Sequence, residues 1–339
     1  MAVTGSNNKT ETKEKKPGIK DVAKEAGVSP TTVSRVMNSS GYISEETRNK
    51  VYQAMERIGY YPNEIARALL NNRSYFIGII VPSITAPFHG EIVQNIEACL
   101  ARENYKMFLC NSNDKIETEK EYISMLRRSQ VDGMIVGTHN YVVDEYASLS
   151  MPVVAIDRYL GDKIPTVSCN NYQVGELATR HLLERGCRKI LCIRGDSLLK
   201  MPGNNRSRAY LDVMREAGLE AMVLEVPFVK PEEEKRKLIY SMLNEHPDLD
   251  GIFAGDDLLA VIAMQIAEEM GIPVPEKLKI IGVDGARQTV LFRPDLTTVQ
   301  QPIKEISEQA VEKMIDLIEG RPCESREDLP VRLLQGKST

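Results

Sequence analysis

Residues 19–38 read IKDVAKEAGVSPTTVSRVMN, and this stretch decides the fold of the first part of the chain. Apolar residues recur in it at helical spacing up to Gly27, whose backbone can adopt the left-handed conformation that ends a helix. Ser29 and Pro30 then suit the cap and the first turn of a second helix. The buried side of that helix would carry Val33, Val36 and Met37. The stretch therefore predicts two short helices joined by a tight turn.

The residues that follow predict a third helix, which completes a small bundle. Ser44 can cap this helix and Gly59 can end it, and its inward side carries Val51, Ala54, Met55 and Ile58. The second helix leaves a short polar face outward, made of Thr31, Thr32, Ser34 and Arg35. Such a face can enter the major groove of DNA, where arginine can form two hydrogen bonds with guanine. On pattern alone, a purely structural helical hairpin remains the alternative.

Charge is distributed unevenly along the chain. Residues 1–74 carry a net charge of +4, whereas residues 75–339 carry −9. Lysine and arginine near phosphates release counterions, so a basic head favours a nucleic-acid partner. A solvated basic tail over residues 1–17, which we expect to be disordered, is the simpler explanation for part of this charge.

Length and composition predict a packed protein with more than one structural unit. The chain has 339 residues, of which 42% are hydrophobic. Its six cysteines form no CxxC pair, so we expect neither a structural zinc site nor a disulfide scaffold, and no metal or cofactor. The first residues lack the apolar core of a secretion signal, and no run approaches the ~18 apolar residues of a membrane span. These features predict a cytoplasmic protein that does not interact with membranes.

From residue 75 onward, short apolar runs alternate with helical patterns. The runs FIGIIV, KMFLC, GMIV and VVAI make a first set, and KILCI, MVLEV, GIFAG and KIIGV make a second. This alternation predicts an α/β body of two similar halves, each a parallel sheet covered by helices. Ligands bind such sheets at the carboxyl ends of the strands, where carboxylates fall here at Asp157, Asp256, Asp257 and Asp284. These carboxylates suit a hydroxyl-rich ligand, although each can also serve in a cap or turn, and we expect Asp257 to cap the next helix.

Residues 19–70, with the pattern DVAxxAGVSxxTVSRVMN, resemble the DNA-binding head of the lactose-repressor/galactose-repressor (LacI/GalR) family of bacterial transcription regulators. The resemblance implies a helix-turn-helix head over residues 18–62 and a hinge helix over 63–74 that orders on operator DNA. It also implies an effector-binding and dimerisation body over 75–339, shaped like a two-lobed periplasmic binding protein. One lobe would take residues 75–170 and 303–330, and the other would take 171–302 and 331–339.

The resemblance also implies roles for single residues of the head. The residues that would face bases are Pro30, Thr31 and Arg35. Those placed to reach phosphates are Ser29, Thr32, Ser34 and Asn38, while further backbone or groove contacts would come from Ile19 and Tyr42. Leu69 matches the leucine that this family inserts into the minor groove. Two such heads on a homodimer would bind a pseudo-palindromic operator in double-stranded DNA.

Residues 167–195 and 254–302 resemble the effector-binding body of the same family. By position, the candidate effector contacts are Phe88, Asp157, Arg206, Phe228, Asp256 and Asp284. Asp256-Asp257 departs from the Asn-Asp that is usual in the family. The more acidic cleft favours a neutral sugar over a phosphorylated effector, unless the compensating charge comes from Arg158, Lys200 or Arg206. The segments IDRYLGDKIPTVS and GVDG are most similar to the sucrose or ribose regulators of the family.

These features predict a sequence-specific transcription regulator, most simply a repressor, that acts at the nucleoid and is controlled by a small-molecule effector, a sugar, bound in the cleft between the two lobes. One alternative is a regulator of this family controlled by a phosphorylated carrier protein, and another is a two-lobed solute-binding protein. An enzyme that uses Asp256 and Asp257 as an acid/base pair is disfavoured, because no GxSxG, HExxH, P-loop or GxGxxG motif lies beside them. The histidines lack metal-ligand spacing, which favours surface or core roles for His89, His139, His181 and His246.

Overall fold

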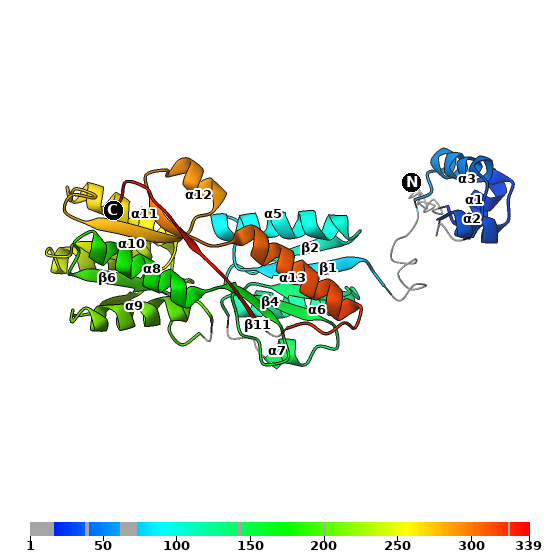
Figure 1. Ribbon diagram of the computed structural model, residues 1–339. Coiled ribbons are helices and arrows are strands. Elements are labelled where there is room, and N and C mark those ends of the chain that lie inside the picture. Colours follow the sequence, from blue (N-terminus) through cyan, green and yellow to red (C-terminus); the bar gives the residue numbers. More distant parts are fainter. Residues whose placement is uncertain (1–16, 38–40, 62–72, 141–143, 200, 325) are drawn as a thin grey trace, which may run out of the picture. The chain divides into compact units, whose positions relative to one another are not determined.

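The computed structural model describes residues 17–37, 41–61, 73–140, 144–199, 201–324 and 326–339. The chain divides into two compact units, Met1–Asn72 and Arg73–Thr339, which we call the head and the body (Figure 1). Within the described ranges, no helix is long and apolar enough to cross a lipid bilayer.

The head is a bundle of three helices, α1 (Ile19–Ala26), α2 (Pro30–Met37) and α3 (Glu45–Ile58). Gly27 ends α1 with a φ of 69°, and Gly59 ends α3 with a φ of 63°. The Ser44 hydroxyl accepts a hydrogen bond from the backbone N–H of Thr47, which caps α3 as expected. The core is formed by Val22, Ala23, Val33, Val36, Val51, Ala54 and Met55. The predicted three-helix bundle is therefore confirmed, whereas residues 62–72, most of the expected hinge, lie outside the described residues.

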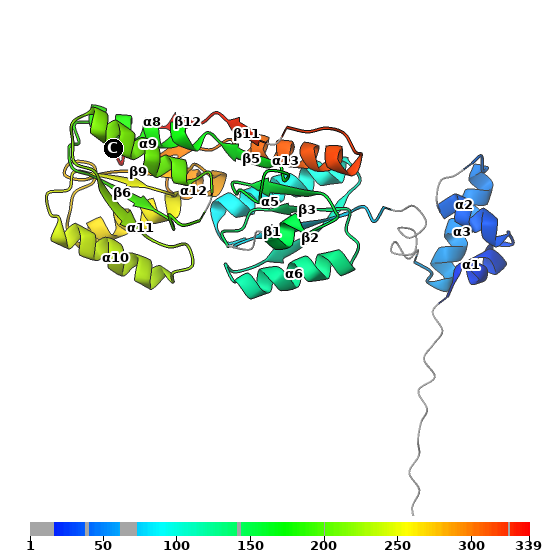
Figure 2. The same ribbon diagram turned by 90° about the horizontal axis from the view of Figure 1, so that it is seen from below.

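The first lobe of the body contains a parallel six-stranded sheet in the order β11-β5-β4-β3-β1-β2. Its strands are β1 (Phe76–Val81), β2 (Lys106–Asn111), β3 (Gly133–Val136), β4 (Val153–Ile156), β5 (Thr166–Cys169) and β11 (Arg326–Leu329). One face is covered by α5 (Pro87–Arg102) and α13 (Ile303–Ile318), and the other by α6 (Ile116–Arg128) and α7 (Asp144–Ala147). Figure 2 shows these layers from below. Alternate side chains of each strand point to opposite layers, as in Ile79 and Ile80.

The second lobe repeats this architecture, with the strand order β12-β10-β9-β8-β6-β7. Its strands are β6 (Ile190–Arg194), β7 (Met222–Glu225), β8 (Gly251–Ala254), β9 (Lys279–Asp284), β10 (Thr297–Gln300) and β12 (Arg332–Leu334). One face packs against α8 (Asn171–Glu184) and α9 (Asn204–Glu216), and the other against α10 (Glu232–Glu245) and α11 (Asp257–Glu269). A short helix, α12 (Arg287–Phe292), follows β9. The predicted pair of parallel sheets is confirmed, and among the strands that the structure describes only β12 runs antiparallel to its neighbour.

The chain passes between the lobes at three points, from β5 to α8, from β10 to α13 and from β11 to β12. Figure 1 shows the last passage as the red segment that crosses the body. The loops after the carboxyl ends of strands in both sheets line one cavity. The fold therefore brings strand ends from distant parts of the sequence to a single site.

Candidate DNA-binding surface and effector cavity

The candidate DNA-contacting side chains of the head gather on α2. Pro30, Thr31 and Arg35 are exposed, and Thr31 and Arg35 share one side of the helix because they are four residues apart. The Ser29 hydroxyl accepts a hydrogen bond from the backbone N–H of Thr32 at 3.0 Å and caps α2. The hydroxyl groups of Ser29 and Thr32 also lie 2.8 Å apart. The beginning of α2 thus presents a polar surface of fixed geometry.

The other candidate DNA contacts lie at different points of the chain. Ser34 is half-buried on α2, Ile19 begins α1, and Tyr42 precedes α3. Tyr42 is 98% exposed, so its ring gains almost no burial within the head and is available to a partner. Asn38 and Leu69 lie outside the described residues.

The two lobes of the body enclose a cavity of about 670 Å³, a size that suits a small organic ligand. All six effector candidates from the sequence line it, although they come from both lobes: Phe88, Asp157, Arg206, Phe228, Asp256 and Asp284. The structure therefore brings these side chains together at one site.

Arg206 on α9 is held firmly at one end of this cavity. Its Nε donates a hydrogen bond to Asn171 Oδ1 at 2.6 Å, and its Nη1 donates to the Gly255 carbonyl at 2.7 Å. Asn171 Nδ2 in turn donates to Asp157 Oδ1 at 3.0 Å, while Arg206 Nη2 lies 3.8 Å from Asp157 Oδ2. A Cβ atom at Gly175 of α8 would lie 2.0 Å from the Arg206 carbonyl oxygen, so only glycine allows this approach of the helices. The charged groups at this end are preorganised before a ligand binds.

Two neighbouring carboxyl groups of the second lobe, Asp256 and Asp257, have distinct surroundings. Asp256 accepts a hydrogen bond from the backbone N–H of Leu259 at 2.7 Å and caps α11. The expectation that Asp257 caps this helix is wrong, because Asp256 has the extended backbone of a cap and Asp257 is already helical. Asp257 is buried and accepts hydrogen bonds from the Gly285 N–H at 2.8 Å and the Thr298 hydroxyl at 2.6 Å.

Burial raises the pKa of several carboxyl groups that line the cavity. It raises the pKa of Asp257 to about 7. Burial, together with the nearby charge of Asp257, raises the pKa of Asp284 well above its usual value. Burial also raises the pKa of Asp157 and Asp256, against the opposing effect of their hydrogen bonds. Near neutral pH the Asp257–Asp284 pair therefore retains a proton, so it can donate as well as accept hydrogen bonds.

Aromatic rings form another part of the cavity wall. His139 and Phe228 stack with their ring centroids 4.4 Å apart and their planes at 23°. His89 contacts Phe88 and His139 edge-on, at 5.3 and 5.5 Å. Burial lowers the pKa of His89 to about 4 and lowers the pKa of His139 as well, so both rings are neutral at physiological pH.

Sequence reasoning missed the two histidines of this wall. It treated all histidines as surface or core groups, whereas His89 and His139 line the cavity. Their spacing carried no signal, because His89 lies on α5 and His139 follows β3. His181, in contrast, is buried and hydrogen-bonds the Thr339 hydroxyl at 2.8 Å.

The charges around the cavity favour a neutral ligand. Arg158 does not compensate the acids, because it is buried and donates from Nη1 to the Thr138 carbonyl at 2.8 Å, and Lys200 lies outside the described residues. Among the described residues, the cations that line the cavity are Arg194, Arg206, Lys235 and Arg293. The acids are more numerous: Asp114, Asp157, Glu232, Asp256, Asp257 and Asp284. With one proton retained by the Asp257–Asp284 pair, up to five of these acids are charged against four cations, so the lining offers an anionic ligand no net positive charge.

Metal binding and disulfide formation have no support in the described residues. No group of three or more His, Cys, Asp or Glu side chains in these ranges could hold a metal ion. All six cysteines are free thiols, and five of them are buried.

Comparison with known proteins places the chain in a family. Residues 18–63 match the family described as "Bacterial regulatory proteins, lacI family", and residues 74–335 match "Periplasmic binding proteins and sugar binding domain of LacI family". The sucrose operon repressor of Pediococcus pentosaceus is 41% identical, over 95% of this chain and 99% of that protein. The ribose operon repressor of Halalkalibacterium halodurans is 37% identical, over 95% of this chain and 96% of that protein.

A solved structure is similar to the body. It is a periplasmic binding protein/LacI transcriptional regulator from Alkaliphilus metalliredigens, complexed with D-xylulofuranose. It has 32% sequence identity and a TM-score of 0.71, and the match covers 78% of this chain and 99% of that one. These relatives are regulators rather than enzymes. With its helix-turn-helix head and its two-lobed, sugar-binding type of body, the chain belongs to the LacI family of bacterial regulatory proteins.

Proposed function

We propose that this protein is a transcriptional repressor that binds a pseudo-palindromic operator as a homodimer and responds to a neutral sugar. The observation that carries the proposal is the combination, in one chain, of an exposed polar face on α2 and a cavity with preorganised polar side chains. Because its partner is chromosomal DNA, the protein would act in the bacterial cytoplasm at the nucleoid.

On the DNA side, we propose that bases are contacted by Pro30, Thr31 and Arg35, and phosphates by Ser29, Thr32, Ser34 and Asn38. Ile19 and Tyr42 would add backbone or groove contacts, and Leu69 would enter the minor groove. In support, Pro30, Thr31 and Arg35 are exposed while the opposite side of α2 packs into the core of the head. This division of the helix matches a recognition helix that presents one side to the major groove.

On the effector side, we propose that Asp157, Arg206, Asp256 and Asp284 hydrogen-bond sugar hydroxyls, and that Phe88 and Phe228 contact apolar faces of the ring. The mixture of carboxylates, protonated carboxyl groups and a guanidinium suits hydroxyls, which both donate and accept. The relatives named as sucrose and ribose operon repressors support a sugar effector. Closure of the lobes around this sugar would change DNA binding only if the two conformations bind it differently.

The decisive experiment combines a selection of DNA sequences with a screen of ligands. The purified protein is used to select duplexes from a random pool at physiological ionic strength, and a thermal-shift screen then tests neutral sugars and sugar phosphates. We expect a palindromic consensus sequence and stabilisation by a neutral sugar that also alters binding to that sequence. Equal affinity for random and selected duplexes would refute the repressor function. Stabilisation only by sugar phosphates, or only by a phosphorylated carrier protein, would refute the neutral-sugar effector.

A further inference from the structure

The chain enters the body at Arg73, and the next two residues lead directly into β1 (Figure 1). They are held by Asp132, a half-buried residue just before β3. Asp132 Oδ1 accepts hydrogen bonds from the Ser74 N–H at 2.7 Å and from the Ser74 hydroxyl at 2.8 Å. Asp132 Oδ2 accepts a hydrogen bond from the Tyr75 N–H at 3.0 Å. We call Asp132, Ser74 and Tyr75 the entry clamp.

Further contacts fix the two residues that precede β1. The Ser74 hydroxyl also accepts a hydrogen bond from the Phe76 N–H at 3.2 Å, and the Tyr75 carbonyl accepts one from the Lys106 N–H at 2.9 Å. The ring centroid of Tyr75 lies 5.4 Å from that of Tyr105, which is buried. Tyr75 has a φ of 57°, a left-handed backbone that a bulky residue keeps only where its surroundings hold it. The chain therefore enters the body in one strained conformation that is fixed from several sides.

The second lobe contains an equivalent carboxylate, which shows what the fold alone requires. Asp250 precedes β8 as Asp132 precedes β3, and β8 lies beside β6 as β3 lies beside β1. The Asp250 carboxylate accepts hydrogen bonds from the N–H groups of Arg188 at 2.7 Å and Lys189 at 2.9 Å, directly before β6. Both lobes therefore use an aspartate to hold the chain where it enters the corresponding strand.

The carboxylate of the first lobe reaches further from its strand. Residues 77 and 190 each pair with the glycine that follows the aspartate, so they are equivalent positions in the two sheets. Asp250 holds the first and second residues before this position, whereas Asp132 holds the second and third. The bonds of Asp132 therefore lie one residue nearer to the head in the sequence.

Two local features also distinguish the entry clamp from its counterpart. Ser74 adds a hydroxyl bond to the clamp, whereas the equivalent Cys187 donates its thiol to the backbone carbonyl of Asp250. Tyr75 has a left-handed backbone, and the equivalent Arg188 does not. Because β6 is held without these features, holding a strand does not explain them. They indicate a role for the clamp in the connection to the head.

We propose that the entry clamp is a positioning device for operator binding. It fixes the point and the direction in which each chain leaves the body, and thereby sets the spacing at which a dimer presents its two heads. This inference rests on the proposed dimeric repressor and adds Asp132 and Ser74 to it as positioning residues. Linked sites act together only if their geometry lets both engage at once. A looser entry clamp therefore weakens binding to a correctly spaced palindrome more than binding to a single half-site.

Gel mobility shift with the full-length protein tests the entry clamp. The probes are the palindrome selected from the random pool, a duplex with one half-site scrambled, and a lengthened palindrome. The last has about two base pairs, a fifth of a helical turn, inserted between its half-sites.

Three variants are compared with the wild-type protein. Asp132→Asn keeps the size of the side chain but removes its charge and replaces one acceptor oxygen by a donor. Asp250→Asn makes the same change at the equivalent, also half-buried position of the second lobe, and is the matched control. Ser74→Ala removes only the hydroxyl bonds of the clamp. Circular dichroism and the melting temperature show whether each variant is folded.

We expect Asp132→Asn to bind the selected palindrome about tenfold more weakly than the wild type and the scrambled duplex within about twofold of it, because each head is unchanged. Its preference for the selected spacing over the lengthened one should shrink accordingly. Ser74→Ala should weaken binding to the palindrome about threefold, since it removes a smaller part of the clamp. Asp250→Asn should bind all three duplexes as the wild type does, even if its melting temperature falls as far as that of Asp132→Asn.

Equal losses of palindrome affinity in Asp132→Asn and Asp250→Asn would overturn the positioning role, because the clamp would then act only through the stability of the body. A wild-type preference for the selected spacing in Asp132→Asn would overturn it too. If Asp132→Asn does not fold, the same result in Ser74→Ala decides against the proposal. If the wild-type protein binds the palindrome no better than the scrambled duplex, the proposed dimeric repressor fails together with the clamp. If it does bind the palindrome better and the variants match it, only the clamp is wrong.

Discussion

At the scale of single residues, Arg35 offers a direct test of operator recognition. Its side chain is exposed on α2, whereas Val33 and Val36 on the same helix belong to the core. Arg35→Ala removes hydrogen bonds to a base but no buried contact, so we expect specific operator affinity to fall by about 1–3 kcal/mol. Fluorescence anisotropy with the selected duplex measures this loss, and an unchanged melting temperature shows that the head is intact. If specific binding were undiminished in this variant, Arg35 would not be one of the residues that contact bases.

The pair Asp257 and Asp284 makes the stability of the body depend on pH. The pKa of both groups is raised in the folded chain, so the folded state binds protons more tightly than the unfolded state. Their stabilising contribution is complete below the unfolded pKa of about 4 and is lost as the pH rises through the pKa of Asp257, about 7.

Asp284→Asn tests this dependence. The variant removes one of two neighbouring charges but keeps an oxygen that can accept from Gln301 Nε2, as Asp284 Oδ1 does at 2.7 Å. We expect the free energy of unfolding of the variant, relative to wild type, to increase as the pH is raised from about 4 to about 7. Urea unfolding at a series of pH values measures this difference. A difference that does not change with pH would contradict the raised pKa values.

From the residue pattern alone, effector candidates could be predicted only at strand ends, whereas Phe88, Arg206 and Phe228 were assigned by the family resemblance. Asp157, Asp256 and Asp284 directly follow or end apolar runs, so pattern and resemblance both pointed to them. His139 and Asp114 carry no such signal, because their proximity depends on the order of strands in the sheet. Asp256 and Asp257 are adjacent aspartates with the same preference for the N-cap position. The sequence therefore could not show which of them caps α11.

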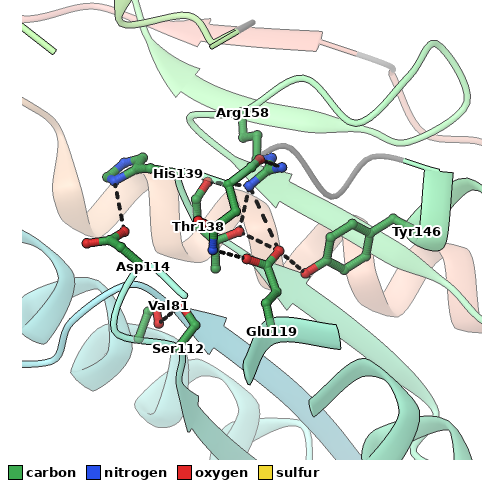
Figure 3. Close-up of polar contacts among 9 residues, drawn as sticks. Val81, Ser112, Asp114, Glu119, Thr138, His139, Tyr146 and Arg158 are labelled. Carbon is green, nitrogen blue, oxygen red and sulfur yellow. Dashed lines mark hydrogen bonds and ion pairs between the residues drawn. The ribbon is translucent and has the colours of Figure 1, made fainter. Parts of the chain in front are cut away.

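At the scale of secondary-structure elements, Glu119 joins α6 to the loop after β3 and to α7 (Figure 3). It accepts hydrogen bonds from the Thr138 hydroxyl at 2.8 Å, from Asn140 Nδ2 at 2.6 Å and from the Tyr146 hydroxyl at 2.6 Å. Its carboxylate lies 3.9 Å from Arg158 Nη1, and both side chains are almost fully buried. The network therefore ties three elements together through one negative charge.

Glu119→Ala would leave the Arg158 charge buried without its partner. We expect the free energy of unfolding of the body to fall by about 3–5 kcal/mol, the usual cost of breaking a buried ion pair. Glu117→Ala, on the exposed side of the same helix, is the control and should change it by less than about 0.5 kcal/mol. Chemical denaturation followed by circular dichroism compares the two variants, and equal losses would show that the network contributes no special stability.

Long elements were predictable from sequence, and several short ones were not. The helix expected between Ser44 and Gly59 has these two residues as its caps in the structure, and the apolar runs of the body form strands. The sequence pattern missed β5, β10, β11, β12, α7 and α12. Each of these has at most six residues, too few for a hydrophobic period to stand out, and a strand such as β12 exists because β10 offers it a free edge.

At the scale of the whole molecule, two identical heads would have to bind together on one operator. A second, tethered contact raises affinity by about 100- to 10,000-fold without new kinds of interaction. We therefore expect a duplex with both half-sites to bind at least about 100-fold more tightly than one with a scrambled half-site. Gel mobility shift measures the two affinities, and analytical ultracentrifugation gives the number of chains per duplex. Equal affinities, or one chain per palindrome, would exclude the dimeric operator complex.

The three passages of the chain between the lobes have a consequence for how such a gene can be recombined. A break after codon 170 would separate β11 and α13 from the rest of their lobe, so the first product would lack one strand of its sheet, whereas the second product would keep all six strands of its own. The boundary near residue 73 is different, because none of the described residues before it contributes a strand to the body. Exchange of the coding segment for the head can therefore join this body to a different DNA-binding head. Neither lobe can be exchanged in the same way, because each lobe is encoded by two separate segments.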